Sequence, residues 1–134
     1  MIIVNEKEHV FHLRNERISY LLYIMESGQP GHLYFGKALQ PGGSYLHMVE
    51  KAHRPMSTYI KEGDLYTSYE HLRQEYPCYG TSDYRYPAME ILGRDGSRIC
   101  KPQYQGYAVI HGKKPLPGLP ATYTEEEGEA DTLE

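Results

Sequence analysis

The sequence contains no tryptophan and only two phenylalanines, but it contains 14 tyrosines among its 134 residues. Aromatic burial must therefore come almost entirely from tyrosine, whose ring can pack in a core while its hydroxyl keeps a partner or water. Apolar surface of this kind suits interfaces as well as cores. The 13 glycines and 9 prolines favour turns and strands over long helices.

The sequence also lacks any apolar run near the roughly 20 residues that a membrane-spanning helix requires, so we expect no membrane partner. The first residues, Met1 to Glu6, lack the basic region and the cleavage site of a signal peptide. We therefore expect a soluble, cytoplasmic protein. The two cysteines, Cys78 and Cys100, have no Cys-x-x-Cys spacing and are predicted to be free thiols, with no zinc or redox centre.

A surplus of basic residues is absent as well, since the formal net charge is −4. Residues 125–134 carry six acids and no base, whereas the rest of the chain carries 12 acids and 14 bases. The acidity is therefore a property of this one segment, which we interpret as a solvated end. Nothing in the sequence forms the basic stripe of a nucleic-acid-binding protein, so no nucleic-acid partner is expected.

Alternation of apolar and polar residues dominates the remaining sequence. It predicts strands at 10–13, 18–25 and 32–37, with the first two joined by a hairpin turn at 14–17. Weaker patterns suggest a short strand at 45–49, one helical turn at 68–74 and further strands at 88–92, 98–104 and 107–111. The predicted fold class is an all-β antiparallel sandwich, possibly with one short helical turn.

The last six residues, 129–134, alternate like another strand entering the sheet. We therefore expect residues 1–134 to be a partial domain, the amino-terminal portion of a larger sandwich. A chain of this length supplies one core.

The segment 74–88 is the most distinctive stretch. Two prolines and a glycine give its backbone an irregular path, and four tyrosines supply rigid contact area. Asp83 and Arg85 can form charge-assisted hydrogen bonds. Three interpretations stay open: packing inside the sandwich, contact with another domain or subunit, and stacking on a sugar, which the absence of tryptophan weakens. The candidate interface or packing residues are Glu75, Tyr76, Tyr79, Asp83, Tyr84 and Arg85.

Five separated motifs together resemble the amino-terminal domain of the bacterial α-galactosidases of glycoside hydrolase family 36. They occur in the same order and span nearly the whole chain: Phe11-His12-Leu13, Gly31 to Lys37, Gln74 to Pro77 with Tyr79-Gly80, Ser82 to Arg85 with Pro87-Ala88, and Leu116 to Tyr123. Departures are modest, since Tyr84 and Tyr86 stand where phenylalanine and a small residue are common, and Lys114-Pro115 swaps a frequent order.

The resemblance implies that the catalytic residues lie elsewhere. Family members join a large amino-terminal β-sandwich to a (β/α)₈ barrel, which carries two catalytic aspartates, and to a small carboxy-terminal β domain. Retaining hydrolysis needs two carboxyl groups about 5–5.5 Å apart. We accordingly assign no catalytic residue, metal or cofactor to this chain, and expect its partner to be the remainder of the parent enzyme.

The resemblance also implies one substrate-binding residue. Family members are typically tetramers, in which the amino-terminal sandwich helps to close the galactose pocket of a neighbouring subunit. The matching acid, usually aspartate, falls here at Glu50, where a carboxylate can accept hydrogen bonds from sugar hydroxyls. The alternative is that Glu50 is an exposed loop acid.

Two functions therefore stay open. The first is a non-catalytic module that assists assembly and completes a neighbouring active site in an α-galactosidase acting on melibiose- or raffinose-like substrates. The second is a free-standing β-sandwich that binds sugar or protein without chemistry.

Overall fold

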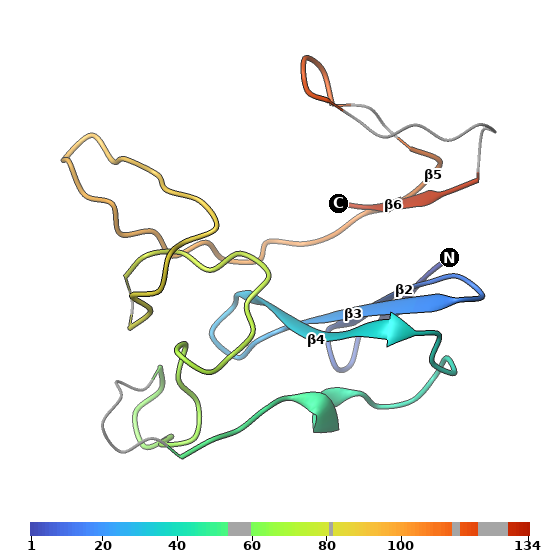
Figure 1. Ribbon diagram of the computed structural model, residues 1–134, viewed down its shortest axis with the longest axis horizontal. Coiled ribbons are helices and arrows are strands. Elements are labelled where there is room, and N and C mark those ends of the chain that lie inside the picture. Colours follow the sequence, from blue (N-terminus) through green and yellow to red (C-terminus); the bar gives the residue numbers. More distant parts are fainter. Residues whose placement is uncertain (54–59, 81, 114–115, 121–128) are drawn as a thin grey trace.

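Four antiparallel strands form the main sheet, in the same order as along the chain (Figure 1). The computed structural model describes residues 1–53, 60–80, 82–113, 116–120 and 129–134. A two-stranded sheet and one 3₁₀ turn complete the regular structure of this part. The elements are β1 (Ile2–Asn5), β2 (Val10–Arg14), β3 (Ile18–Ile24), β4 (Pro30–Lys37), η1 (Leu46–Met48), β5 (Val109–His111) and β6 (Asp131–Leu133).

The turns between the strands are fixed by local hydrogen bonds. Between β2 and β3, the Asn15 Oδ1 atom accepts bonds from the backbone N–H groups of Arg17 and Ile18, at 2.8 and 2.9 Å. Between β3 and β4, Met25 N donates to the Gln29 carbonyl at 2.9 Å, and Gly28 supplies the positive φ of 84°. These turns hold the strands in register.

One face of the main sheet carries the hydrophobic core. Val10, Leu21 and Leu33 point to this face and are almost fully buried. Residues 38–53 and 60–72 (cyan to green in Figure 1) cross beneath it and close the core with Tyr45, Tyr69 and Leu72, all buried as well. Gly31 in β4 is required here, because a Cβ at this position would lie 2.4 Å from the Tyr23 ring.

The opposite face is covered by Tyr104, Tyr107 and the β5–β6 sheet. Phe11 points to this face, is 2 % exposed, and makes edge contacts with the rings of Tyr104 and Tyr107 at centroid distances of 6.2 and 5.1 Å. The Tyr107 hydroxyl donates to Glu6. The β5–β6 sheet lies above this face, and β6 contacts β1 (Figure 1). The main sheet is therefore covered on both sides.

The predicted all-β antiparallel fold with one short helical turn is confirmed. The three strands predicted between residues 10 and 37 are present as β2, β3 and β4. Two predictions near the carboxy terminus are confirmed in shortened form, because 107–111 contributes β5 and 129–134 contributes β6. The strand β1 was not predicted, since its four residues are too few to show a period.

Other predictions were wrong in detail. Residues 45–49 contain the 3₁₀ turn η1 and not a strand. By contrast, the single turn predicted within 68–74 is present, since His71 N and Leu72 N both donate to the Ser68 carbonyl, at 3.0 and 3.1 Å. Residues 88–92 and 98–104 join neither sheet, although Met89 forms an isolated β-bridge with Cys78. No helix among the described residues is long and apolar enough to cross a membrane.

Candidate functional site

The distinctive segment 74–88 begins where the chain pairs with the start of β4. His32 N donates to the Arg73 carbonyl at 2.7 Å, and Glu75 N donates to the Pro30 carbonyl at 3.0 Å. Two of the sequence motifs, 31–37 and 74–80, therefore meet in space. The first residues of the segment consequently extend the main sheet.

A half-buried hydrogen-bonded cluster secures this junction. The Glu75 carboxylate accepts bonds from the Tyr20 hydroxyl and from His32 Nδ1, the latter at 2.9 Å. The Glu75 side chain is only 17 % exposed. Burial, followed by the bond to Glu75, raises the pKa of Tyr20, so its hydroxyl stays a proton donor. Sequence reasoning missed Tyr20 and His32 as partners, because they lie 55 and 43 positions from Glu75.

The next part of the segment is closed by a buried ion pair. The Asp83 side chain is 2 % exposed, whereas that of Arg85 is 44 % exposed. The Arg85 guanidinium donates two bonds to the Asp83 carboxylate, from Nε at 2.8 Å and from Nη2 at 2.7 Å. Gln74 Nε2 adds a third side-chain bond at 2.7 Å, so the carboxylate is well satisfied.

The same guanidinium connects the segment to the core. Arg85 Nη2 donates to the carbonyl of Tyr69 and, at 3.4 Å, to that of Leu72, in the turn that lies beneath the main sheet. Burial alone would raise the pKa of Asp83, but the bonds from Arg85 and its positive charge outweigh this effect. The pKa of Asp83 therefore lies below its usual value, and the pair is ionised at neutral pH.

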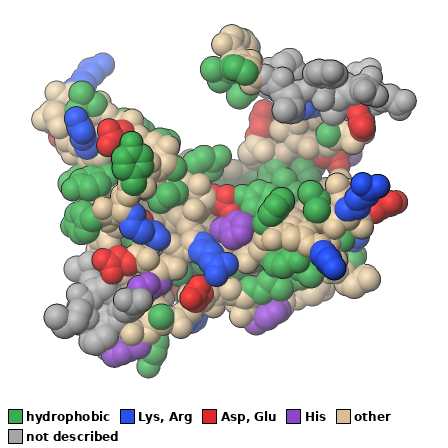
Figure 2. Space-filling view, in the orientation of Figure 1, with side chains coloured by type: hydrophobic (Ala, Val, Ile, Leu, Met, Phe, Trp, Pro, Cys, Tyr) green, Lys and Arg blue, Asp and Glu red, His purple; other side chains and the backbone are tan. Residues whose placement is uncertain are grey.

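The tyrosines of the segment face outward. Tyr76, Tyr79, Tyr84 and Tyr86 are 60, 41, 68 and 94 % exposed. Figure 2 shows hydrophobic side chains gathered on the same side of the molecule, over the loop coloured yellow to orange in Figure 1. Of the six candidate interface or packing residues, Glu75, Asp83 and Arg85 make hydrogen bonds within the fold, whereas the tyrosine rings are exposed.

Glu50 lies close to this junction but on the surface. It follows η1 in an extended stretch, and its Oε2 atom lies 3.3 Å from Arg73 Nη2. Both side chains are mostly exposed, at 61 % for Glu50 and 64 % for Arg73. Arg73 is also the residue whose carbonyl pairs with β4. The Glu50 carboxylate is thus oriented by a neighbour whose backbone is fixed by the sheet.

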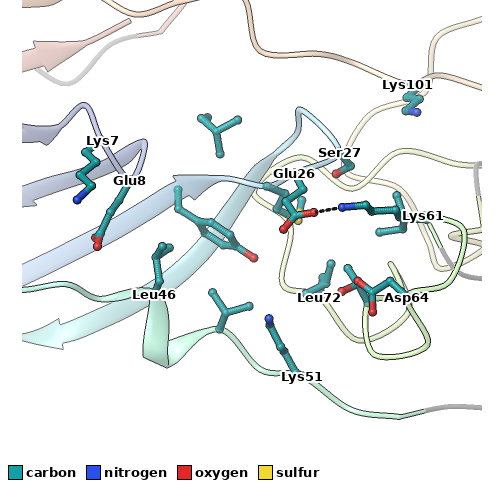
Figure 3. A pocket seen from close by; sticks show the side chains of 16 residues that line it. Lys7, Glu8, Glu26, Ser27, Leu46, Lys51, Lys61, Asp64, Leu72 and Lys101 are labelled. Atoms are coloured by element: carbon teal, nitrogen blue, oxygen red, sulfur yellow. Dashed lines mark hydrogen bonds and ion pairs between the residues drawn. The ribbon is translucent and has the colours of Figure 1, made fainter.

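A cavity of about 630 Å³ lies beside the core, between the end of β3, η1 and residues 60–67. Its floor is apolar, with Tyr23, Leu46 and Leu72 among its lining residues, and its rim carries charges of both signs (Figure 3). Lys61 on this rim is ion-paired with Glu26 at 3.1 Å. Among the described residues, no group of three or more His, Cys, Asp or Glu side chains could hold a metal ion.

Comparison with known proteins places this arrangement in a family. The model of the glycosyl hydrolase family 36 N-terminal domain matches residues 28–134. The chain belongs to this family. The matched residues include Glu75 with its partner His32, the Asp83–Arg85 pair and the outward tyrosines, whereas Tyr20 precedes them.

The relatives are much longer than this chain. The α-galactosidases AgaA of Geobacillus stearothermophilus and Mel36A of Lactobacillus acidophilus are 36 and 37 % identical to it, over 99 % of the chain but only 18 % of each relative. The solved structure of the α-galactosidase of Lactobacillus brevis has a TM-score of 0.90 at 30 % identity and covers 98 % of the chain. This family 36 domain also spans 18 % of that structure's chain.

A second solved structure is informative about ligands. A variant of AgaA from Geobacillus stearothermophilus in complex with raffinose matches with a TM-score of 0.82 at 37 % identity, over 92 % of this chain and 17 % of its own. The raffinose is bound to that AgaA variant.

Proposed function

We propose that this chain is the amino-terminal, non-catalytic part of an α-galactosidase, a partial domain that serves assembly and completes a neighbouring active site. The observation that carries the proposal is that 99 % of the chain aligns with only 18 % of each of two longer α-galactosidases. In this proposal, terminal α-galactosyl residues are hydrolysed with retention by a barrel outside residues 1–134. The substrates proposed are melibiose- or raffinose-like, in a cytoplasmic tetramer.

Glu50 is the residue through which this domain would reach the substrate. Its carboxylate is charged, mostly exposed and oriented by Arg73 at 3.3 Å, so it can accept a hydrogen bond from a sugar hydroxyl of a neighbouring subunit. The outward tyrosines Tyr76, Tyr84 and Tyr86 support the assembly role, because large exposed rings are enriched at protein interfaces.

Substitution of Glu50 in the intact enzyme tests the role in substrate binding. We expect Glu50→Gln to raise KM for a nitrophenyl α-galactoside by about tenfold with little change in kcat, because a charge-assisted bond contributes about 1.5–3 kcal/mol and the site is partly hydrated. Glu90→Gln is the matched control, since Glu90 is also exposed (55 %) and paired with an arginine, Arg98, at 3.7 Å. Unchanged kinetics for Glu50→Gln, or an equal change for Glu90→Gln, would contradict this role.

A subunit-mixing experiment tests whether Glu50 acts on a neighbour. Glu50→Gln subunits with an intact barrel are co-assembled with subunits whose barrel is inactivated and whose Glu50 is unchanged. If Glu50 serves the neighbouring pocket, mixed oligomers contain a fraction of sites with the original KM. If it serves its own subunit, every active site keeps the raised KM.

The alternative is a free-standing β-sandwich that binds sugar or protein without chemistry. The exposed aromatic rings favour it, since sugars stack on such surfaces, and Tyr86 is 94 % exposed. The reading frame after residue 134 discriminates between the two functions. An in-frame barrel with catalytic aspartates supports the α-galactosidase, and a stop codon supports the free-standing module.

A further inference from the structure

Cys78 and Cys100 flank a protruding loop, of which the structure describes residues 79–80 and 82–99 (yellow to orange in Figure 1). Cys100 N donates to the Tyr79 carbonyl at 3.3 Å, which joins the two ends of the loop. Gly80 and Ile99, the next residues into the loop from each end, are also close together: a Cβ added to Gly80 would lie 2.7 Å from Ile99 Cγ2. Both cysteines are free thiols, and the pKa of the Cys78 thiol is raised by burial and by the neighbouring Cys100.

We propose that Cys78 and Cys100 are a modification site, at which a reversible disulfide forms by exchange with a low-molecular-weight disulfide such as oxidised glutathione. The thiolate of Cys100 attacks one sulfur of glutathione disulfide and displaces one glutathione thiolate. The thiolate of Cys78 then attacks the Cys100 sulfur of the mixed disulfide and displaces the second glutathione. Two protein thiols are oxidised, one small disulfide is reduced, and two glutathione thiols are released.

The surroundings of the two thiols set the order of these steps. The Cys78 residue is 4 % exposed, and its thiol donates to the Tyr76 carbonyl at 3.5 Å, whereas Cys100 is partly exposed. A glutathione molecule can therefore reach Cys100 first. Burial, followed by the neighbouring Cys100, raises the pKa of the Cys78 thiol, which further lowers its thiolate fraction. Cys78 reacts second, when contact with Cys100 makes the step intramolecular.

The consequence concerns the surface that the loop presents. A disulfide needs Cα atoms within about 7 Å, which is compatible with a backbone bond between Cys100 and the neighbour of Cys78. The bridge would close the loop at its base, and the loop carries exposed apolar side chains including Tyr84, Tyr86 and Leu92. Oxidation would therefore restrain the segment that carries this apolar surface without altering the main sheet.

Peptide mapping of the intact enzyme tests the proposal. The reduced native protein is incubated with oxidised glutathione, its remaining thiols are blocked, and it is digested with trypsin. We expect peptide 74–85 joined to peptide 99–113, lighter by two hydrogens than the separate peptides, with loss of maleimide labelling at both cysteines. Protein that yields only unlinked peptides, or glutathione adducts on both cysteines, would overturn the proposal.

Two variants give an asymmetric second readout. In Cys78→Ser, we expect Cys100 to accumulate as the stable glutathione adduct, because the second thiol is missing. In Cys100→Ser, we expect Cys78 to stay unmodified in the native protein and to react once the protein is unfolded. A Cys78 that reacts as readily as Cys100 in the native single-cysteine variants would contradict the assigned order.

Discussion

The buried ion pair between Asp83 and Arg85 offers the most direct test of how the segment 74–88 is held. The perturbation is Asp83→Asn, which keeps the size of the side chain and removes its charge. The backbone N–H of Arg85 can still be accepted by Oδ1 of the asparagine. The new amide group, however, faces Gln74 Nε2 and Arg85 Nη2, which are both donors and were both 2.7 Å from the Asp83 Oδ2 atom.

The magnitude follows from burial and from the number of bonds lost. Removing one partner of a buried ion pair costs about 3–5 kcal/mol, and a hydrogen bond to a charged group contributes about 1.5–3 kcal/mol. The Arg85 side chain is 44 % exposed, so its guanidinium regains water once the carboxylate is gone. We therefore expect the free energy of local opening to fall by about 2–4 kcal/mol, a range centred below that of a fully buried pair.

Hydrogen exchange measured by mass spectrometry on the intact enzyme reports this opening. The relevant amides are those of Leu72, Gly80, Asp83 and Ala88, which donate to carbonyls within the segment or the turn beneath it. Their protection should fall roughly 30- to 700-fold in Asp83→Asn, since about 1.4 kcal/mol corresponds to a factor of ten. Protection within about threefold of the original value would refute the stabilising role of the pair.

Asp95→Asn is the matched control. Asp95 also accepts a bond from the backbone N–H two residues later, Ser97 N at 3.0 Å, but it is exposed and forms no ion pair with an arginine in the described part of the chain. We expect a change within about 0.5 kcal/mol. A loss of protection at residues 69–88 as large as that in Asp83→Asn would show that the effect is not specific to the buried pair.

The loss of stability at low pH tests the contribution of the Asp83 charge. The pKa of Asp83 lies below its usual value of 3.8, so the ionised pair stabilises the segment above about pH 4. This stabilisation is lost as the pH falls through the folded-state pKa. We expect the protection of the segment to decrease in this range in the original protein, and the decrease to be smaller in Asp83→Asn.

Two further predictions use the same exchange measurement with matched pairs. Gly80→Ala should destabilise its segment by about 2–3 kcal/mol, whereas Gly96→Ala should destabilise its own by about 1 kcal/mol. Both glycines have a positive φ, but only at Gly80 would an added Cβ meet a neighbour, Ile99 at 2.7 Å. Equal effects would contradict the close approach. Tyr20→Phe should lower the protection of the His32 and Glu75 amides by about 1–2 kcal/mol, because the Glu75 carboxylate loses a hydrogen bond. The Tyr34 hydroxyl donates to an exposed carbonyl, so Tyr34→Phe should change this protection by less than about 0.5 kcal/mol. No difference between the two tyrosines would argue against the Glu75 cluster.

The strands that could be predicted from the sequence are those with local partners. β2 pairs with β3 and β3 with β4, the next strand along the chain in each case, and in β3 and the first half of β4 the alternation matches the buried positions. Residues 88–92 and 98–104 show similar alternation, yet Ile91, Leu92 and Ile99 are 50, 69 and 64 % exposed. Alternation indicates that a segment can be a strand. Whether it becomes one depends on a neighbour that sequence patterns do not identify.

In the candidate site, too, contacts between residues close in sequence could be predicted and contacts between distant residues could not. The pairing of Asp83 with Arg85 follows from two residues that are close in sequence and opposite in charge, and it is present. The Tyr20–Glu75–His32 cluster joins three segments that are distant in sequence, so only the fold brings it together. The contact of the Cys78 and Cys100 thiols, which are 22 positions apart, likewise depends on the path of the intervening loop.

The order of residues 83–86 explains how one segment serves both packing and presentation. The Asp83 carboxylate accepts bonds from the Arg85 backbone N–H and guanidinium, whereas Tyr84 and Tyr86 are 68 and 94 % exposed. The charged pair is drawn inward because it bonds to Gln74 and to the carbonyl of Tyr69. Its partners then fix which way the rings must point. The outward tyrosines are therefore a consequence of the buried pair, and their exposure does not depend on a flexible loop.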